Sequence, residues 1–287
     1  MSQNNKPLVS VIIPTYNAGA VIDRCLTSVV NQTHTNLQII CCDDCSSDDT
    51  YQKLLAWTEK DSRITVMQNE VNSRAAFSRN RCIKMTEGKY VAQIDDDDYC
   101  EPDRIERQVR FLEDNPAYDF LGTGIYYFDE NGVWGESEWE EDFAPQKEDF
   151  LFNAVFINPS MMYRREALEA VGGYRIAKET RRGQDYDLHM RMYAAGLKGY
   201  IMADRLTYYY RGKKSFPKCK YKYRIDEAKI RWKNFKALGL LPKGIHFVIK
   251  PLIVGLIPLS VIERIKRRLG KNKLKKVETS GDKEENS

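Results

Sequence analysis

Four consecutive carboxylates, residues 95–98, directly follow the run Tyr90-Val91-Ala92-Gln93-Ile94. A β-rich, largely apolar run with polar flanks predicts a buried strand. Adjacent carboxylates repel one another, so they need a cation, hydrogen-bond donors or bulk water. Since ligands in open α/β sheets bind beyond the carboxyl ends of the strands, this position predicts a Mg²⁺ or Mn²⁺ site. A solvated acidic turn is the alternative explanation.

Two other predicted strands also end in polar residues. The run 8–15 leads into Pro14-Thr15-Tyr16-Asn17, and the run 37–42 leads into Asp43-Asp44. In a parallel sheet these ends lie on the same edge as the four carboxylates. Together they predict a cleft that can bind a base beside a metal site that can hold phosphates. Taken alone, Asp44 is equally explained as a helix N-cap or turn residue, and Tyr16 as a packing residue.

Helical patterns separate these strands. Apolar residues recur at helical spacing over 21–30 and 75–85, and Gly88 is predicted to end the second helix. Pro102 is predicted to occupy the first position of another helix. The alternation predicts an α/β fold, with a mostly parallel sheet between two layers of helices. Additional strands are predicted at 64–67, 118–128 and 157–163.

The composition of the 287 residues limits the class of protein. A hydrophobic fraction of 42% suits a sizeable buried core, enough for one α/β domain with or without an appendage. The seven cysteines argue against a disulfide framework, and Cys41 and Cys42 are expected on opposite faces of a strand. The N-terminus carries no secretory signal pattern. No dinucleotide-binding or P-loop motif follows the first strand, which argues against both of those folds.

Seven motifs between Val9 and about Arg211 occur in the order of one known family. They are V-S-V-I-I-P-T-Y-N at 9–17, D-D-C-S-S-D-D-T at 43–50, S-R-N at 78–80, G-K-Y-V-A-Q-I-D-D-D-D at 88–98, P-D-R-I at 102–105, G-G-Y at 172–174 and Q-D-Y-D-L at 184–188. In these motifs the chain resembles family 2 glycosyltransferases of the GT-A fold. The resemblance implies a Rossmann-like three-layer α/β/α architecture and inverting, nucleotide-sugar-dependent transfer with Mg²⁺ or Mn²⁺ as cofactor.

The resemblance also implies roles for the residues in these motifs. Pro14, Tyr16 and Asp44 would contact the base of the donor, and Arg79 and Asp95 would lie near its ribose and phosphates. Asp97 would be the main metal ligand. The full set of expected donor-binding residues is Pro14, Thr15, Tyr16, Asn17, Asp44, Arg79, Asp95 and Asp96.

The catalytic base that the resemblance implies is Asp185. The family pattern is Glu-Asp, and this chain carries Gln184 in place of the Glu, so a neighbouring charge is missing. The segment is predicted to begin a helix, whose macrodipole would lower the pKa of Asp185. A helix-capping role for Asp185 is the alternative explanation.

A further set of residues is expected on the acceptor side. The acidic segment 129–149 is predicted to form a loop or hairpin there. Its Trp134 and Trp139 can stack on sugar rings, although an interface or core role is commoner for Trp. Gln184 and Asp187 complete this set, and Asp187 is the next candidate for the base.

The C-terminal part of the chain is basic. Between 211 and 273 the only acids are Asp226, Glu227 and Glu263, which indicates a basic surface for an anionic partner. A basic helix is predicted over 221–238. The apolar run 247–262 is shorter than the ~20 residues of a spanning helix, and its basic flank 264–268 suggests an interfacial helix on an anionic membrane. A helix packed on the core is the alternative.

These patterns divide the chain into three parts. Residues 1–211 are expected to form a GT-A catalytic domain, with a nucleotide-binding half at about 7–100 and an acceptor half at about 101–211. Residues 212–269 are expected to form a flexible segment, which in this family can close over bound donor, followed by a basic helical extension. Residues 270–287 are polar and expected to be disordered.

The expected activity is transfer of a sugar from a nucleoside-diphosphate sugar, with UDP as the expected nucleotide, to a hydroxyl of a glycan or lipid-linked acceptor. The expected process is synthesis of cell-surface polysaccharide or glycolipid, at the cytoplasmic side and peripheral to the inner face of the cell membrane. No nucleic-acid partner is expected. Gln184 keeps non-catalytic nucleotide-sugar or glycan binding as an alternative. A metal-dependent phosphohydrolase is disfavoured, because no nucleophilic Asp follows the first strand.

Overall fold

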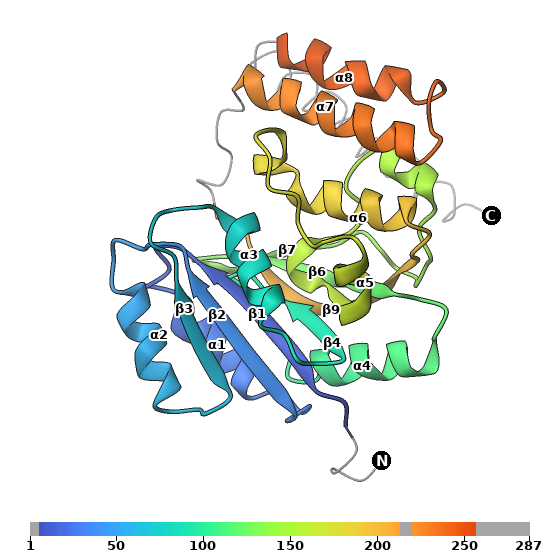
Figure 1. Ribbon diagram of the computed structural model, residues 1–287. Coiled ribbons are helices and arrows are strands. Elements are labelled where there is room, and N and C mark those ends of the chain that lie inside the picture. Colours follow the sequence, from blue (N-terminus) through green and yellow to red (C-terminus); the bar gives the residue numbers. More distant parts are fainter. Residues whose placement is uncertain (1–5, 213–219, 257–287) are drawn as a thin grey trace, which may run out of the picture.

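A mixed sheet of nine strands runs through the computed structural model, which describes residues 6–212 and 220–256 (Figure 1). The strand order is β3-β2-β1-β4-β8-β6-β9-β5, with β7 paired to β6. The strands are β1 (Val9–Thr15), β2 (Leu37–Asp43), β3 (Ile64–Gln68), β4 (Tyr90–Gln93), β5 (Tyr99–Cys100), β6 (Phe120–Asp129), β7 (Gly132–Glu136), β8 (Met162–Arg164) and β9 (Gly199–Tyr210). Strands β3, β2, β1 and β4 are parallel, β6 is parallel to β9, and β8, β7 and β5 run antiparallel to their neighbours.

Helices cover both faces of this sheet and so form three layers (Figure 1). Three helices pack on one face: α1 (Ile22–Val30), α2 (Thr50–Thr58) and α4 (Arg104–Asp114). On the opposite side lie α3 (Ala75–Lys84), α5 (Arg165–Ala170) and α6 (Gln184–Ala194). Beyond them, α7 (Tyr221–Ala237) packs on α6, and α8 (Ile245–Leu256) packs on α7. Short 3-10 helices lie in the connections: η2 (Lys147–Leu151), η3 (Asn158–Ser160) and η4 (Glu179–Arg182).

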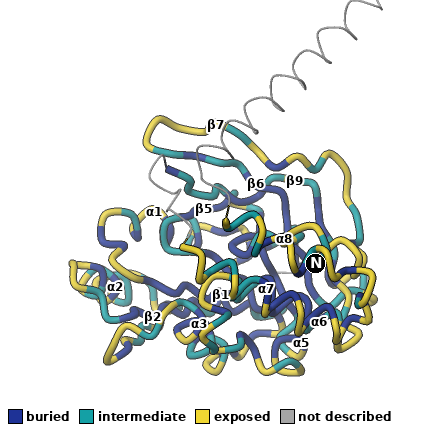
Figure 2. Tube along the Cα trace, turned by 90° about the horizontal axis from the view of Figure 1, so that it is seen from above, coloured by how far each residue is buried: buried dark blue, intermediate teal, exposed yellow. Residues whose placement is uncertain are grey.

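Successive residues of the central strands enter different cores. Ile39 and Cys41 pack with α1, α2 and α4, whereas Ile40 and Cys42 pack with α3 and the helices on its side. This alternation confirms that Cys41 and Cys42 point to opposite faces. In Figure 2 the central strands are buried, and β7 forms an exposed hairpin with β6. A sheet buried on both faces presents its ligand-binding groups beyond the carboxyl ends of its strands.

Two predicted helix starts or ends are wrong. Helix α3 ends at Lys84, so Gly88 does not end it. The Gly88 N–H donates instead to Ser10 Oγ at 3.0 Å, and a Cβ at Gly88 would lie 2.6 Å from the Ser10 nitrogen. This close approach of two backbones requires glycine. Helix α4 begins at Arg104, and Pro102 lies in the turn before it.

The segment 157–163 is not one continuous strand, which corrects the prediction. Its middle forms the 3-10 helix η3, and only its end enters the sheet, as β8 between β4 and β6. Pro159 lies in η3 and has no N–H to donate to a sheet. The turn brings Asn158 and Pro159 to a cavity described below.

Helices α7 and α8 lie side by side beyond the sheet (Figure 1). Helix α7 confirms the predicted basic helix, and α8 buries Val248 and Pro251 while Ile249 and Ile253 are exposed. Several predicted segments lie outside the described residues. They are residues 213–217 of the predicted flexible segment, the rest of the apolar run, the basic flank 264–268 and the tail 270–287. Across the ranges that the structure describes, every helix is too short or too polar to cross a membrane.

Candidate active site

A first cavity of about 220 Å³ lies at the sheet edge where β1, β2 and β4 end. Thr15 pairs with Asp43 across β1 and β2, so the residues after both strands meet at this edge. The cavity is lined by Pro14, Thr15, Tyr16, Asp44, Ala75, Ser78, Arg79, Asp95, Asp96 and Asp97. The structure therefore brings together all the predicted donor-side and metal residues except Asn17.

Asn17 instead joins the loops that follow β1 and β2. Its Oδ1 accepts the N–H of Ser47 at 2.9 Å, and its own N–H donates to Ser46 Oγ at 2.9 Å. Its φ of 51° lies in the left-handed region, which Asn tolerates better than most residues. The neighbouring Tyr16 donates its N–H to Asp96 Oδ2 at 2.8 Å, and the residue is 49% exposed. Its ring can contact a planar ligand.

Asp44 organises the start of α3. Its Oδ1 accepts the Ser73 N–H at 2.8 Å and the Asn69 amide at 2.7 Å, and its Oδ2 accepts the Arg74 N–H at 2.7 Å. Arg74 has φ 74° and ψ 161°, a conformation that costs about 1–3 kcal/mol for a residue other than glycine. The carboxylate therefore stabilises a strained helix N-terminus while it also lines the first cavity. Asp44 is not the N-cap of the helix that follows it, because Asp49 holds that position in α2.

Arg79 is the buried cation of this cavity. Its Nη2 donates to Asp95 Oδ1 at 2.5 Å, and its guanidinium carbon lies 5.5 Å from the centre of the Tyr174 ring. Burial opposes the charge, but Asp95 and Tyr174 raise the pKa of Arg79 above its ordinary value, so the group stays charged. Its Nε and Nη1 atoms have no hydrogen-bond partner among the described residues. Because arginine can only donate, these buried atoms suit an anionic ligand.

Two reciprocal hydrogen bonds hold Tyr174 next to Arg79. Asn80 Nδ2 donates to the Tyr174 carbonyl at 2.7 Å, and the Tyr174 N–H donates to Asn80 Oδ1 at 2.8 Å. Gly173 has a φ of 66°, and a Cβ there would lie 2.6 Å from Asn80 Oδ1. Glycine is therefore required at this contact. The Gly173 N–H also donates to the Leu168 carbonyl, which ends α5 at the predicted glycine pair.

The four consecutive carboxylates do not share one environment. Burial raises the pKa of Asp96 to about 7 and that of Asp97 to about 6, and neighbouring carboxylates add to both shifts. Asp98 is fully buried and accepts the Tyr210 N–H at 2.7 Å. Burial and Asp97 raise the pKa of Asp98 well above its usual range. Asp98 is absent from the cavity lining, so the run offers three carboxylates to a ligand.

The carboxylates of the first cavity fit a hard divalent cation that is held mainly by substrate oxygens. Within residues 6–212 and 220–256, no three or more Asp, Glu, His or Cys side chains form a metal-binding group. Mg²⁺ commonly takes one or two protein carboxylates and completes its shell with water and substrate phosphates. Asp97 offers such a carboxylate, and a cation would offset the Asp95 charge that helps raise its pKa.

A second cavity of about 630 Å³ opens beside the first, and Arg79, Asp95 and Asp97 line both. The rest of its lining comes from β6, the loop and turn around η3, the η4–α6 segment and the end of β9. These residues are Ile125, Tyr127, Phe156, Ile157, Asn158, Pro159, Arg182, Gln184, Asp185, Tyr209, Tyr210 and Arg211. The structure thus brings Asp185 and Gln184 into one space with Arg79, Asp95 and Asp97 of the first cavity.

Asp185 lies in the first turn of α6. Burial raises the pKa of Asp185 above its usual value, although the Tyr186 N–H and the Arg79 charge act in the opposite direction. The prediction of a lowered pKa is wrong, because loss of hydration outweighs the favourable helix dipole. In its ionised form a carboxylate with a raised pKa is a stronger base.

Asp187, the other predicted candidate on α6, is not brought to these two cavities. It is 0% exposed and accepts hydrogen bonds from Arg175 at 2.5 Å, Arg191 at 2.8 Å and Asn234 at 2.8 Å. Asn234 lies on α7, so Asp187 joins α6 to α7 through a buried ionic network. These contacts indicate a structural role.

The two predicted tryptophans lie in different surroundings. Trp139 is half-buried and packs edge-on against Phe143, as a core residue does. Trp134 on β7 is 50% exposed and stacks on Tyr127 with 5.2 Å between ring centres. Because Tyr127 lines the second cavity, Trp134 lies behind its wall and not in it.

Sequence reasoning missed most of the second cavity. Tyr209 belongs to the run of three tyrosines that ends β9, and this run was the sequence signal that could have indicated it. Burial raises the pKa of Tyr209, and the carboxylates of Asp98 and Asp95 add to the shift. Its hydroxyl therefore stays protonated and can donate. Arg182 and Asn158 had no comparable signal, because only the fold brings η4 and η3 together.

The comparisons with known proteins agree on one family. A family model described as Glycosyl transferase family 2 matches residues 10–172. The chain is 32% identical over 266 residues to the putative glycosyltransferase EpsE of Bacillus subtilis (strain 168), and the match covers 92% of this chain and 95% of EpsE. It is 36% identical over 129 residues to the Escherichia coli UDP-Glc:alpha-D-GlcNAc-diphosphoundecaprenol beta-1,3-glucosyltransferase WfaP, covering 42% of this chain and 51% of WfaP.

Two solved structures have a similar fold. TarS 1–349 of S. aureus in complex with UDP-GlcNAc has a TM-score of 0.67 at 22% identity, with 86% of this chain and 71% of that chain covered. Mannosyltransferase PcManGT from Pyrobaculum calidifontis in complex with GDP-Man and Mn²⁺ has a TM-score of 0.60 at 18% identity, with 93% and 81% covered. These likenesses confirm the expected α/β architecture of the GT-A type.

Proposed function

Because this chain belongs to glycosyltransferase family 2, we propose that it transfers a sugar from a nucleotide-sugar, with inversion, to a hydroxyl of a glycan or lipid-linked acceptor. The observation that carries this proposal is the shared lining of the two cavities. Arg79 and Asp97 line both, and Asp185 lines the second. One continuous space can therefore hold a diphosphate near Arg79 and an acceptor hydroxyl near Asp185, with the sugar between them.

The first cavity is proposed to hold the nucleoside diphosphate. Tyr16 can stack on the base, and the unpartnered Nε and Nη1 atoms of Arg79 can donate to phosphate oxygens. Thr15 Oγ1 is also buried without a hydrogen-bond partner in the described chain and can contact the ribose or base. We propose UDP as the nucleotide, because WfaP and the TarS complex are both described with a UDP-sugar.

The proposed cofactor is Mg²⁺ or Mn²⁺, held by Asp97 and by phosphate oxygens. When bound, such an ion neutralises the charge that develops on the leaving diphosphate. The Mn²⁺ in the PcManGT complex supports this proposal for the same fold. Arg79 provides a fixed positive charge on the same side, preorganised by its bond to Asp95.

The proposed chemical step is a single in-line displacement. The acceptor oxygen forms a bond to the anomeric carbon while the bond from that carbon to the diphosphate oxygen breaks, and the bonding electron pair leaves with the diphosphate. Asp185 takes the proton of the acceptor hydroxyl as this bond forms. One displacement inverts the anomeric carbon, and a positioned general base contributes roughly 10²–10⁴-fold to such a step.

We propose a cytoplasmic location at the inner face of the cell membrane, in the synthesis of a cell-surface polysaccharide or glycolipid, with no nucleic-acid partner. The WfaP description, which contains a diphosphoundecaprenol acceptor, supports this process. The exposed Ile249 and Ile253 of α8 and the exposed Trp232 of α7 supply apolar area for the membrane. Between 220 and 256 the lysines and arginines greatly outnumber the acids Asp226 and Glu227, which suits an anionic leaflet. The catalytic domain is proposed to end near Arg211, before these helices.

The test begins with thermal unfolding against a panel of nucleotide-sugars in the presence of Mn²⁺. A ligand that binds only the folded state raises its stability by mass action, so the donor should stand out. Transfer from that donor is then followed by NMR of the product, and an inverted anomeric configuration is expected. A retained configuration contradicts the mechanism, and tight donor binding without transfer or hydrolysis favours the non-catalytic alternative.

A further inference from the structure

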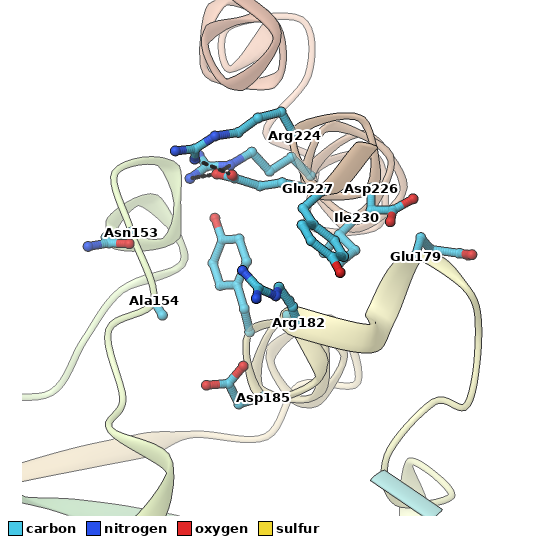
Figure 3. A pocket seen from close by; sticks show the side chains of 13 residues that line it. Asn153, Ala154, Glu179, Arg182, Asp185, Arg224, Asp226, Glu227 and Ile230 are labelled. Carbon is cyan, nitrogen blue, oxygen red and sulfur yellow. Dashed lines mark hydrogen bonds and ion pairs between the residues drawn. The ribbon is translucent and has the colours of Figure 1, made fainter. Parts of the chain in front are cut away.

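A third cavity, here named the α6–α7 chamber, lies between α6 and α7. It has a volume of about 360 Å³, within the range of roughly 300–1,000 Å³ that small-molecule sites occupy. Figure 3 shows Arg224, Glu227 and Ile230 on α7 across from Asp185, with Asn153 and Ala154 at the side. The full lining is Asn153, Ala154, Glu179, Arg182, Gly183, Asp185, Tyr186, Tyr223, Arg224, Asp226, Glu227, Ile230 and Arg231.

The chamber adjoins the second cavity at two residues. Arg182 and Asp185 line both spaces, whereas Arg79 and Asp97 line only the first and second cavities. The three cavities therefore follow one another in a row, and Asp185 stands between the last two. A ligand whose hydroxyl reaches Asp185 from the second cavity can extend past it into the chamber.

Several polar groups of the chamber have no partner within the described part of the chain. Arg182 makes no hydrogen bond or ion pair there, and its guanidinium carbon lies 4.3 Å from the centre of the Tyr223 ring. Glu179 and Asp226 also lack hydrogen bonds and ion pairs among the described residues. By contrast, the Glu227 carboxylate is occupied by Arg224 at 3.2 Å and Arg231 at 3.1 Å.

We propose that the α6–α7 chamber binds a neutral sugar residue of the acceptor, next to the residue whose hydroxyl is glycosylated. This inference rests on the proposed function and deepens it, because it makes the acceptor an extended glycan. Hydroxyl groups both donate and accept hydrogen bonds. They can therefore satisfy the carboxylates of Glu179 and Asp226, which only accept, and the guanidinium of Arg182, which only donates.

An anionic sugar fits the same groups less well. Besides Asp185, Glu179 and Asp226 place two further carboxylates without an ion pair at the chamber, and Arg182 is its one cation without an ion-pair partner in the described chain. A carboxylate or phosphate on the ligand would meet repulsion from both acids.

The test uses saturation-transfer NMR of the full-length protein with neutral and anionic probes. The neutral probes are the methyl β-glycosides of glucose, galactose and N-acetylglucosamine, and the anionic probe is methyl β-glucuronide. Ala154→Trp places a large ring in the chamber, and Ala237→Trp adds the same ring to an exposed site on α7 outside it. Asp226→Ala removes one hydrogen-bond acceptor without filling the space.

At least one neutral glycoside should bind the wild type and Ala237→Trp. Its affinity should fall at least about 10-fold in Ala154→Trp, which fills the space, and by a smaller factor in Asp226→Ala, where water can replace the lost acceptor. The inference is overturned if no neutral glycoside binds, if Ala154→Trp binds it as well as the wild type, or if glucuronide binds more tightly.

Calorimetry with nucleotide-sugars and Mn²⁺ on the same four proteins separates this inference from the proposed function. Donor affinity should be equal in all four, because the substitutions lie outside the first cavity. If no nucleotide-sugar binds while the neutral glycosides behave as expected, the proposed function fails and the chamber remains a sugar site. If nucleotide-sugars bind and the neutral glycosides do not, the inference about the chamber fails and the proposed function stands.

Discussion

Arg79 Nη2 lies 2.5 Å from Asp95 Oδ1, and the two side chains form part of the wall between the first and second cavities. This bond fixes the guanidinium while two of its nitrogen atoms remain unpartnered among the described residues. A hydrogen-bond donor that is oriented before the ligand arrives loses little conformational entropy on binding. The pair is therefore well placed to bind a diphosphate and to stabilise the charge it acquires.

Replacement of Arg79 by Met should weaken nucleoside-diphosphate binding about 10- to 100-fold, since hydrogen bonds to charged groups contribute about 1.5–3 kcal/mol. Titration calorimetry with UDP and Mn²⁺ measures this change. The matched control is Arg110→Met, which removes an exposed charge on α4 away from both cavities. Equal affinities of the two variants would remove Arg79 from the donor site.

Metal-dependent donor binding should be lost at acidic pH. The pKa of Asp97 is raised to about 6, so below that pH the carboxyl is protonated and cannot bind a cation. Without metal, the folded protein holds the Asp97 proton more tightly than the unfolded chain does, because the pKa is raised above the ordinary 3.8. The protonated carboxyl therefore stabilises the fold at low pH, and this stability is lost as the pH rises through about 6. The increase in melting temperature caused by Mn²⁺ and UDP should therefore be large near pH 8 and small near pH 5. Asp97→Asn should abolish the Mn²⁺-dependent part of this increase at both pH values, and a variant that keeps it would show that Asp97 is not the ligand.

Asp185→Asn should lower the transfer rate roughly 10²–10⁴-fold or more, because the amide keeps the shape but cannot take a proton. Donor affinity should be nearly unchanged, since Asp185 does not line the first cavity. Gln184→Glu, which restores the family pattern beside the base, should be tolerated and is the control. Near-normal transfer by Asp185→Asn would exclude Asp185 as the base.

Asp187→Ala should lower the free energy of unfolding by about 3–5 kcal/mol, because it leaves the buried charges of Arg175 and Arg191 without their partner. Urea unfolding of this variant measures the loss. The exposed Asp114→Ala on α4 should change stability by less than about 0.5 kcal/mol. A stable Asp187→Ala protein with lost transfer activity would instead give Asp187 a role in the reaction.

The α8 surface should hold the protein on anionic vesicles. The double substitution Ile249→Asp and Ile253→Asp removes exposed apolar area and adds negative charge, so vesicle co-sedimentation should fall severalfold. Val71→Asp, another exposed apolar position, is the control and should bind like the wild type. High salt should weaken wild-type binding. Unchanged co-sedimentation of the double variant would exclude this surface as the membrane contact.

The first cavity was accessible to sequence reasoning because its walls are recognisable motifs, at the ends of β1, β2 and β4 and on α3. Parallel register then places Thr15 and Asp43 at one edge without further information. The second cavity was not accessible in this way. Its residues come from β6, η3, α6 and β9, and only tertiary packing brings Asn158 and Tyr209 beside Asp185.

Two errors arose because tertiary contacts outweighed a local sequence signal. Gly88 matched the pattern of a helix end, but its glycine is required by the approach of its backbone to Ser10, a contact between distant segments. The pKa of Asp185 was predicted from the helix dipole alone. Burial, which sequence position does not reveal, acts in the opposite direction and is larger.

The contact between Gly173 and Asn80 has a consequence for the evolution of this sequence. A side chain at position 173 would meet the Asn80 amide, which is the group that holds the Tyr174 backbone. Changing either partner alone therefore disturbs the ring beside Arg79. A library randomised one position at a time should find both positions intolerant, whereas paired randomisation can recover combinations that no single step reaches. Among relatives, positions 80 and 173 should vary together or not at all.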